Sequence, residues 1–374
     1  MAFSLMEGNE AIAWGAFKGG CRFFAGYPIT PASSVLTHML SLLPPAGGYV
    51  LQGEDEIASI GYCLGASMAG YKAVTATSGP GISLCSEQIS FAIGSEIPVV
   101  IIDAQRLGPS TGSATMGADG DIQFLRWGNS GGLPVIVLAP TDVRDCFELT
   151  ARAMNLAEIY RCPVFIASNK EIALTKESVE FDQFILPKIV DRKLSNAPQQ
   201  FKPFQVKSSD GVPDFLPFGS ETLVRQTSSS HGEDGYITTN TAILEKTRER
   251  LRDKLEKRVD EFTYYEFLDG NDANTLVITY GVTARAAKEA YSRFEEQNTA
   301  GFSLLVLKTL WPVSERLIQE FANDYSRILV IEMNLGQYLL EIKRTLPEKK
   351  IDFLGQMNGM LITPDQIYKA VSNE

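Results

Sequence analysis

The sequence predicts an α/β protein with a doubly wound sheet and a second, smaller α/β domain. Apolar segments of strand type alternate with helical periodicity over residues 1 to about 170. The alternation fails from Pro187 to Ser230 and resumes at Asn274, so two regular parts flank an irregular middle. A length of 374 residues is sufficient for two domains with cores of their own.

The first regular part repeats one unit, an apolar strand followed by a turn of small residues and a helix. Continuously apolar strands that alternate with helices are typical of a parallel sheet covered on both faces. We expect strands at residues 21–26, 49–53, 73–77, 98–103, 134–139 and 163–167. We expect helices from Pro31 to about Met39, after Glu54, from the SGPG turn to about Ile93, and over 142–159.

The irregular middle is expected to be a functional arm or an interdomain linker, because long segments without periodicity are uncommon inside compact domains. After it, Thr241–Phe262 has the pattern of a charged amphipathic helix, which we interpret as a solvated surface helix. A smaller α/β unit follows, with strands at 274–280, 303–307 and 328–333 and helices from about Thr283 and Val313. The predicted domain boundaries are therefore 1–186, 187–262 and 263–374.

The composition argues against several classes of protein. A net charge of -11 does not suit a nucleic-acid-binding surface, which needs clustered lysine and arginine. The N-terminal segment lacks a basic stretch followed by an apolar core, so we expect no signal peptide. No run of about 18 apolar residues occurs, so we expect no membrane span and a cytoplasmic location.

The cysteine and histidine content argues against a metal site within this chain. The five cysteines form no CxxC motif and lie mostly inside apolar runs, so we expect buried thiols in a reducing compartment. Neither His38 nor His231 lies in a G-x-S-x-G context, so a catalytic triad has few candidates. The segment GADGD at Gly117–Asp121 is weak support for magnesium, and we expect no metal ligand in this chain. The cysteines are Cys21, Cys63, Cys85, Cys146 and Cys162.

The turn after the first predicted strand is the first candidate for ligand binding. We expect Thr30 at the N-cap of the next helix and Pro31 at its first position. Ligands of open α/β sheets bind at the carboxyl ends of the strands, and a helix N-terminus attracts carboxylates and phosphates. An ordinary capped helix explains the same residues, so the turn alone does not decide between structure and function.

Two further turns should open on the same edge of the sheet. The acids Glu54, Asp55 and Glu56 follow the second predicted strand, and Arg106 follows a later one in the segment AQRLGPSTG. Arginine binds a planar carboxylate through two parallel hydrogen bonds, and a positioned acid can exchange a proton with a cofactor nitrogen. The acids also suit the first turn of a helix, where negative charge is favourable, so both interpretations stay open.

These turns belong to an ordered set of segments that resembles a known family. The set is GYPITP, QGEDEIAS, TSGPG and QRLGPSTG, then VPDFLPFG and SSSHGEDGY, and finally IEMNLGQ. In these segments the chain resembles the α subunit of the 2-oxoacid:ferredoxin oxidoreductases over nearly its whole length, and it looks closest to the 2-oxoglutarate type. The resemblance implies a thiamine diphosphate-binding domain of the pyrimidine type and a transketolase C-terminal-like domain.

The resemblance also implies an activity, the coenzyme A-dependent oxidative decarboxylation of 2-oxoglutarate to succinyl-CoA with reduction of ferredoxin. Glu56 matches the acid that contacts the aminopyrimidine of the cofactor and is the implied catalytic residue. Thr30 and Arg106 match the pair that holds the substrate carboxylate, and Ser110 and Thr111 are expected to assist. The implied cofactor-binding residues are Tyr27, Pro28, Ile29, Glu56 and Ser78.

The resemblance further implies partners, because the chain has neither cluster cysteines nor a complete magnesium–diphosphate motif. A β subunit should supply the diphosphate and magnesium half of the thiamine diphosphate site and a [4Fe-4S] cluster, and the chain alone should be inactive. Accessory γ and ferredoxin-like subunits and ferredoxin itself are the other expected partners. Branched-chain 2-oxoacids and pyruvate are alternative substrates. A non-oxidative thiamine diphosphate-dependent decarboxylase or transketolase-like enzyme, and a non-catalytic scaffold subunit, are the alternative functions.

Overall fold

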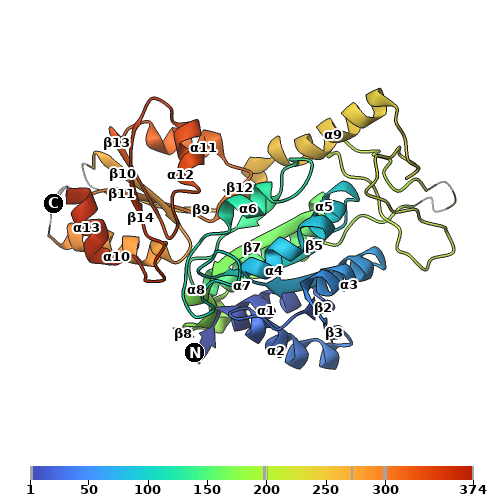
Figure 1. Cartoon of the computed structure of the whole chain (residues 1–374), viewed down its shortest axis with the longest axis horizontal. Coiled ribbons are helices and arrows are strands. Elements are labelled where there is room, and N and C mark those ends of the chain that lie inside the picture. Colours follow the sequence, from blue (N-terminus) through green and yellow to red (C-terminus); the bar gives the residue numbers. More distant parts are fainter. Residues whose placement is uncertain (1–2, 197–198, 200, 271–272, 298–300, 373–374) are drawn as a thin grey trace.

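The computed structural model describes residues 3–196, 199, 201–270, 273–297 and 301–372, so small parts of the predicted segments 1–186, 187–262 and 263–374 lie outside the described residues. The described residues form two α/β units, one on a seven-stranded sheet and one on a five-stranded sheet (Figure 1). The first sheet has the strand order β12 (Thr309–Trp311), β6 (Ile136–Leu138), β7 (Pro163–Asn169), β5 (Val99–Gln105), β4 (Ala73–Thr77), β2 (Phe23–Gly26) and β3 (Tyr49–Gln52). From β6 to β3 all the pairs are parallel.

The second sheet has three parallel pairs and one antiparallel edge. Its order is β14 (Lys350–Gly355), β13 (Arg327–Glu332), β10 (Thr275–Tyr280), β11 (Ser303–Leu307) and β9 (Tyr265–Leu268). Only β9 runs antiparallel to its neighbour. A separate antiparallel ribbon pairs β1 (Ser4–Glu7) with β8 (Lys176–Val179).

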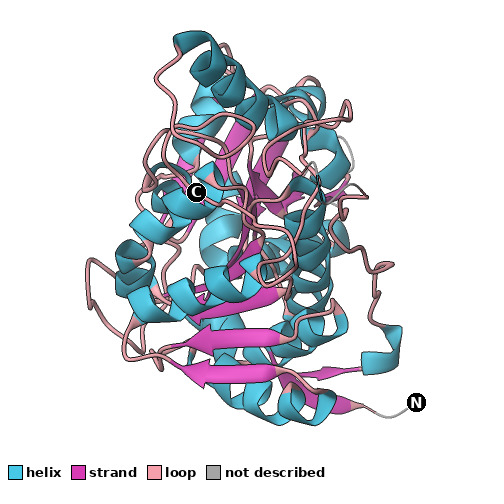
Figure 2. Cartoon of the chain, turned by 90° about the vertical axis from the view of Figure 1, so that its right-hand side faces the viewer, coloured by secondary structure: helices cyan, strands magenta, loops and turns pink. Residues whose placement is uncertain are grey.

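Helices cover both faces of the first sheet, as Figure 2 shows with cyan helices on either side of the magenta strands. On one face α1 (Gly8–Lys18), α2 (Ser33–Leu42) and α7 (Val143–Tyr160) pack against side chains that include Val100 and Ile102 of β5. On the other face α3 (Glu56–Met68) and α5 (Ser86–Gly94) pack against a set that includes Ile101. Successive side chains of a strand point to opposite faces, so a strand buried on both faces reads as one apolar run.

The remaining α-helices are α4 (Gly79–Leu84), α6 (Ile122–Trp127), α8 (Lys170–Leu174), α9 (Thr241–Glu256), α10 (Thr283–Glu296), α11 (Glu315–Ala322), α12 (Leu339–Thr345) and α13 (Pro364–Ser372). Over the described ranges, no helix is long and apolar enough to cross a membrane. The strands predicted at 73–77 and 303–307 have the predicted bounds, and α10 begins at the predicted Thr283.

Helix α2 begins later than the sequence predicted. Thr30 is not its N-cap and Pro31 is not its first residue, because the helix starts at Ser33 after Ala32, which makes no side-chain cap. The carbonyl groups of Thr30 and Pro31 accept hydrogen bonds from distant side chains instead of forming the first bonds of the helix. The carbonyl oxygen of Thr30 accepts a hydrogen bond from Arg106 at 2.6 Å, and that of Pro31 accepts one from Asn9 at 2.7 Å. Tertiary contacts thus shorten the helix at its N-terminus.

Strand β12 was not predicted, and it carries the chain of the second unit into the first sheet. Thr309 and Trp311 pair antiparallel with Leu138 and Val137 of β6, directly after β11 has ended in the other sheet. The indole nitrogen of Trp311 donates to the carbonyl oxygen of Ile122 at 3.2 Å. Three residues are too few for a periodic signal, so the sequence gives no sign of this crossing.

Helix α9 is shorter and less solvated than predicted, because it ends at Glu256 and part of it is anchored in the first unit. Arg250 and Lys254 extend from it to Glu96, with N–O distances of 2.7 and 2.9 Å, and both Lys254 and Glu96 are buried. Burial alone would raise the pKa of Glu96, but Lys254 and Arg250 hold that pKa well below its ordinary value. The pairing compensates for the burial of the charges on Glu96 and Lys254.

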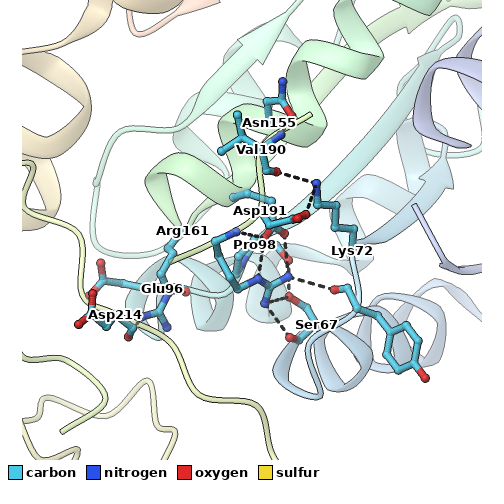
Figure 3. A network of polar contacts seen from close by, with 12 residues as sticks. Ser67, Lys72, Glu96, Pro98, Asn155, Arg161, Val190, Asp191 and Asp214 are labelled. Atoms are coloured by element: carbon cyan, nitrogen blue, oxygen red, sulfur yellow. Dashed lines mark hydrogen bonds and ion pairs between the residues drawn. The ribbon is translucent and has the colours of Figure 1, made fainter. Parts of the chain in front are cut away.

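A second group of buried charges fastens the start of the irregular middle to the first unit (Figure 3). Arg192 donates to both carboxylate oxygens of Glu158 at 2.6 and 2.7 Å and to the carbonyl oxygens of Ser67 and Tyr71. Lys72 donates to the carbonyl oxygen of Val190 at 2.6 Å. The residues around 190 are therefore held by the surface of the first unit.

We predict that Arg192→Leu destabilises the protein by about 3–5 kcal/mol, because it leaves the buried carboxylate of Glu158 without its partner. The double variant Arg192→Leu, Glu158→Leu should recover part of this loss, since both charges are then removed. Thermal denaturation followed by circular dichroism measures both effects. The ion pair of exposed Arg252 with half-buried Asp253 provides the control, and Arg252→Ala should leave the melting temperature nearly unchanged. A melting temperature of Arg192→Leu equal to that of the control would contradict the prediction.

Candidate active site

The candidate site residues lie at the carboxyl ends of four adjacent strands. In the first sheet β3, β2, β4 and β5 are neighbours and run parallel. The turns that follow them open on one edge of the sheet, where ligands of open α/β sheets bind. The residues singled out in the sequence are distributed over these turns: Tyr27, Pro28, Ile29 and Thr30 after β2, Glu56 after β3, Ser78 after β4, and Arg106, Ser110 and Thr111 after β5.

Arg106 joins two of these turns. Its side chain is buried, with one terminal nitrogen donating to the carbonyl oxygen of Thr30 at 2.6 Å and the other to that of Thr111 at 2.8 Å. Its Nε atom is buried and has no hydrogen-bond partner among the described residues. A guanidinium that binds only uncharged carbonyl groups keeps its positive charge available for an anion.

The turn that carries Thr111 is shaped by left-handed backbone conformations. Ser110 has a φ of 53° and Gly112 a φ of 50°. At Gly112 a Cβ atom would lie only 1.8 Å from the carbonyl oxygen of Leu107, so only glycine fits there. Leu107 and Ser113 close the turn through a short antiparallel bridge. Ser110 and Thr111 are exposed at the tip of this turn.

The structure assigns different positions to the three acids after β3. Asp55 is the N-cap of α3, and its carboxylate accepts a hydrogen bond from the Ala58 nitrogen at 2.7 Å. Glu54 is exposed, whereas Glu56 is 6% exposed. The side chain of Glu56 lies against Gly81, where a Cβ atom would be 2.5 Å from its Oε1 atom. Asp55 therefore serves the helix terminus, and Glu56 is the acid that faces the interior.

The remaining predicted residues divide into an exposed and a buried group. Tyr27, Pro28 and Thr30 are exposed and Ile29 is half-buried, so the turn after β2 faces outward. Ser78 is fully buried at the N-cap of α4, and its Oγ atom has no hydrogen-bond partner among the described residues. An orphaned buried hydroxyl indicates a place where a polar ligand group can be satisfied.

Sequence reasoning missed the buried Asp103, and it considered Asp119 and Asp121 only as part of a weak magnesium motif. Asp103 near the end of β5 has no hydrogen-bond partner for either oxygen, and one oxygen each of Asp119 and Asp121 also lacks a partner. Burial, with the neighbouring Asp121 and Asp119, raises the pKa of Asp103 well above its ordinary value. Burial also raises the pKa of Asp121 to about 6, against an opposing effect of Arg106. The position of Asp103 at the end of an apolar run was the available signal.

These acids do not form a metal centre. Among the residues that the structure describes, no group of three or more histidine, cysteine, aspartate or glutamate side chains is arranged to hold a metal ion. Burial raises the pKa of Asp119 to about 7, with Glu332 and Asp121 adding to the shift and a hydrogen bond from Asn169 opposing it.

The sequence matches two family models in succession. Residues 14–250 match the family described as pyruvate flavodoxin/ferredoxin oxidoreductase, thiamine diphosphate-binding, and residues 273–367 match core domain II of pyruvate:ferredoxin oxidoreductase. The chain is 37% identical to the 2-oxoglutarate synthase subunit KorA of Methanothermobacter thermautotrophicus, covering 98% of this chain and 97% of that subunit. It is also 37% identical to the Methanocaldococcus jannaschii KorA, covering 99% of this chain and all of that subunit.

The fold matches two solved structures to different degrees. The 2-oxoglutarate:ferredoxin oxidoreductase from Magnetococcus marinus, with 2-oxoglutarate, coenzyme A and succinyl-CoA bound, superposes with a TM-score of 0.93 at 32% identity. This chain is covered to 99% in that comparison and spans 65% of the length of the matched chain. A split-gene transketolase superposes with a TM-score of 0.54 at 12% identity, which shows a shared fold. The predicted fold class, a doubly wound domain with a smaller transketolase-like α/β domain, is confirmed.

We predict that Asp119→Asn stabilises the protein relative to the wild type as the pH rises from about 4 to about 7. The folded-state pKa lies above the unfolded value, so over this range the unfolded state loses its proton first and wild-type stability falls. Asparagine has no proton to lose and keeps the acceptor for Asn169. Melting temperatures of both proteins across this range measure the difference. Asp182→Asn, at an exposed side chain, serves as the control, and parallel curves for Asp119→Asn and the wild type would refute the prediction.

Proposed function

Because the chain belongs to the thiamine diphosphate-binding family of pyruvate flavodoxin/ferredoxin oxidoreductases, we propose that it is the α subunit of a 2-oxoglutarate:ferredoxin oxidoreductase. The reaction consumes 2-oxoglutarate, coenzyme A and two oxidised ferredoxins. It yields succinyl-CoA, carbon dioxide, one proton and two reduced ferredoxins. The observation that carries this proposal is the match over nearly the full length of both chains with the 2-oxoglutarate synthase subunits KorA.

The buried groups of the site fit one half of thiamine diphosphate. Glu56 is an interior acid beside Gly81, where the lack of a side chain leaves room for its carboxylate. The orphaned hydroxyl of Ser78 lies directly after strand β4, which β2 separates from the strand before Glu56. Glu56 and Ser78 would hold the pyrimidine part, and Tyr27, Pro28 and Ile29 would line its approach. When bound, thiamine diphosphate supplies the electron sink for decarboxylation.

Glu56 is the proposed proton-transfer residue of this chain. It would exchange a proton with the N1′ atom of the aminopyrimidine. A general acid or base of this kind works only when its carboxylate is fixed within hydrogen-bond reach of the reacting nitrogen. The backbone of Glu56 is fixed by the first turn of α3, which Asp55 caps, and by the contact of Cys85 with its carbonyl oxygen.

Arg106 and Thr30 are the proposed substrate-binding pair. The guanidinium binds a carboxylate of the 2-oxoacid through N–H groups that lie in its plane. The hydroxyl of the exposed Thr30 adds a further hydrogen bond. The hydrogen bonds of Arg106 to Thr30 and Thr111 already hold it at the edge of the site, so little side-chain entropy is lost when substrate binds. Ser110 and Thr111, at the exposed tip of the same turn, are the proposed assisting residues.

The chain acts within a larger assembly. All five cysteines are free and buried, and burial raises the pKa of Cys21 to about 12, so these thiols do not suit cluster ligation. A β subunit is proposed to bring the diphosphate and magnesium half of the site and the [4Fe-4S] cluster. About a third of the Magnetococcus marinus chain lies outside the match, and a separate γ subunit is proposed as a further partner. Ferredoxin-like subunits and ferredoxin complete the proposed partners.

The three-part division of the chain is also part of this proposal. Residues 1–186 form the pyrimidine-type domain, 187–262 form an arm held by buried charges, and 263–374 form the transketolase C-terminal-like domain. Free, buried cysteines are typical of a reducing compartment, which supports a cytoplasmic location.

Three alternatives differ in measurable ways. The chain is 30% identical to the ketoisovalerate oxidoreductase subunit VorB of Methanothermobacter thermautotrophicus over 97% of its length. Branched-chain 2-oxoacids therefore stay alternative substrates, and pyruvate is a further one. A non-oxidative thiamine diphosphate-dependent decarboxylase or transketolase-like subunit would turn over substrate without reducing an acceptor. A scaffold subunit would be dispensable for turnover.

We predict that the purified complex of this chain with its partner subunits reduces a viologen dye when given 2-oxoglutarate and coenzyme A. The specificity constant for 2-oxoglutarate should exceed those for pyruvate and 2-oxoisovalerate by at least about tenfold. The complex without this chain is the control and should be inactive. Release of carbon dioxide without dye reduction would favour the non-oxidative alternative, and a preference for 2-oxoisovalerate would reassign the substrate.

We predict that Glu56→Gln assembles with its partners but loses at least about a hundredfold in turnover, because an amide cannot exchange a proton as a carboxylate does. Deuterium exchange at C2 of the bound cofactor should slow as well, which separates this step from the later chemistry. Glu54→Gln is the matched control, since Glu54 is exposed two residues away, and its effect should be small. Wild-type exchange in Glu56→Gln would remove Glu56 from this role, and an equal loss in Glu54→Gln would transfer the role to Glu54.

A further inference from the structure

The segment Glu332–Gln337, which we call the latch, leaves β13 of the second unit and binds the loop of the first unit that follows Arg106. The backbone nitrogen of Asp119 donates to the carbonyl oxygen of Met333 at 2.9 Å. The side-chain amide of Asn334 donates to the carbonyl oxygen of Asp119 at 2.8 Å, and that of Gln337 donates to the carbonyl oxygen of Gly120 at 2.5 Å. The latch thus satisfies three backbone groups of Asp119 and Gly120 in the GADGD segment.

Gln337 makes a second, reciprocal contact with the first unit. Its Oε1 atom accepts from the backbone nitrogen of Gln123 at 2.9 Å, and its carbonyl oxygen accepts from the side-chain amide of Gln123 at 2.7 Å. These bonds lie at the start of α6, where backbone nitrogens lack partners within the helix. Gln337 therefore binds both sides of the turn between Gly120 and Gln123.

Hydrogen bonds within the second unit fix the shape of the latch. The carboxylate of Glu332, 1% exposed, accepts from the Tyr280 hydroxyl at 2.8 Å and from the backbone nitrogens of Tyr338 and Leu339 at 2.9 and 2.8 Å. The Asn334 Oδ1 atom accepts from the backbone nitrogens of Gly336 and Gln337 at 2.8 and 2.9 Å. Side chains whose rotamers are fixed in this way present their donors without further ordering.

Hydrogen bonds connect the loop held by the latch to the two residues that flank Arg106 and to Arg106 itself. At the far end, the Asp121 backbone nitrogen donates at 2.9 Å to the side chain of Gln105, the residue before Arg106. At the near end, the Leu107 nitrogen donates to the carbonyl oxygen of Met116 at 2.8 Å. Between them, the carbonyl oxygen of Thr111 accepts from Arg106. A shift of the loop would therefore move the groups that orient the guanidinium.

We propose that the latch is a positioning element for the substrate, in which Asn334 and Gln337 of the second unit set the orientation of Arg106 through the loop 107–121. The inference rests on the proposed binding of the substrate carboxylate by Arg106. It gives the second unit a part in substrate binding, although none of its residues belongs to the predicted site. Neither Asn334 nor Gln337 contacts substrate in this proposal, and both act through hydrogen bonds to the backbone of the loop.

The test uses Gln337→Ala in the fully assembled complex. The KM for 2-oxoglutarate should rise by about threefold to tenfold, the size expected when hydrogen bonds to the loop are lost. The KM for coenzyme A, the affinity for thiamine diphosphate and kcat should change little. Gln123→Ala removes the hydrogen bond that the Gln123 side chain donates to the carbonyl oxygen of Gln337. This change should also raise the KM for 2-oxoglutarate.

Gln356→Ala is the matched control, because the Gln356 side chain binds Met360, Leu361 and Gln366, all within the second unit. It should leave the KM for 2-oxoglutarate at the wild-type value. A rise equal to that of Gln337→Ala would mean that any disturbance of the second unit has this effect, and it would overturn the inference. A lower melting temperature of Gln337→Ala with an unchanged KM would also overturn it.

A double-mutant cycle with Arg106→Lys separates the latch from the proposed function. Lysine cannot reproduce the planar donors of arginine, so Arg106→Lys alone should raise the KM for 2-oxoglutarate. In that background Gln337→Ala should add little, because both changes act on the same contact. A full additional rise would overturn the latch as a positioning element. An unchanged KM in Arg106→Lys would instead refute the proposed role of Arg106.

Discussion

The hydrogen bonds of Arg106 to the carbonyl oxygens of Thr30 and Thr111 are the contacts on which the candidate site depends. They join the turns after β2 and β5. Thr30 and Arg106 are 76 residues apart in the chain. A buried cation is costly unless its donors are satisfied, so this guanidinium constrains the backbone of both turns. The constraint also explains why α2 starts at Ser33, since the Thr30 carbonyl is used outside the helix.

The rest of the molecule supports that edge of the sheet with further buried polar contacts. Arg192 with Glu158, and Glu96 with Arg250 and Lys254, hold the arm and α9 against the first unit. Strand β12 and the latch bind the second unit to the first unit. Strand β12 pairs with β6, and the latch forms hydrogen bonds to the loop 107–121. These contacts are directional, so they determine relative placement more strongly than apolar packing would.

The site is suited to one half of a shared chemistry. It has an interior carboxylate at Glu56, an available positive charge at Arg106 and exposed turn residues around Tyr27, but no described cluster of metal ligands. Burial raises the pKa of Asp103 and of Asp119 beneath it, which lowers their negative charge and so reduces repulsion of an anionic substrate. The relatives of this chain are named as subunits, which supports the proposal that a partner subunit completes the site.

The sequence by itself determined the strands β2 to β7, β10, β11 and β13, most helices and the turns that carry the site, because apolar periodicity and small-residue turns are local properties of the chain. The short strands β1, β8, β9, β12 and β14 were not predicted. It also determined the family, through segments whose order is informative even where each is short. Only the tertiary structure decided that Asp55 caps α3 while Glu56 turns inward, that β12 crosses to the first sheet, and that the latch reaches Asp119. These features depend on hydrogen bonds between residues far apart in the chain, and no local pattern encodes which distant partner a polar group will find.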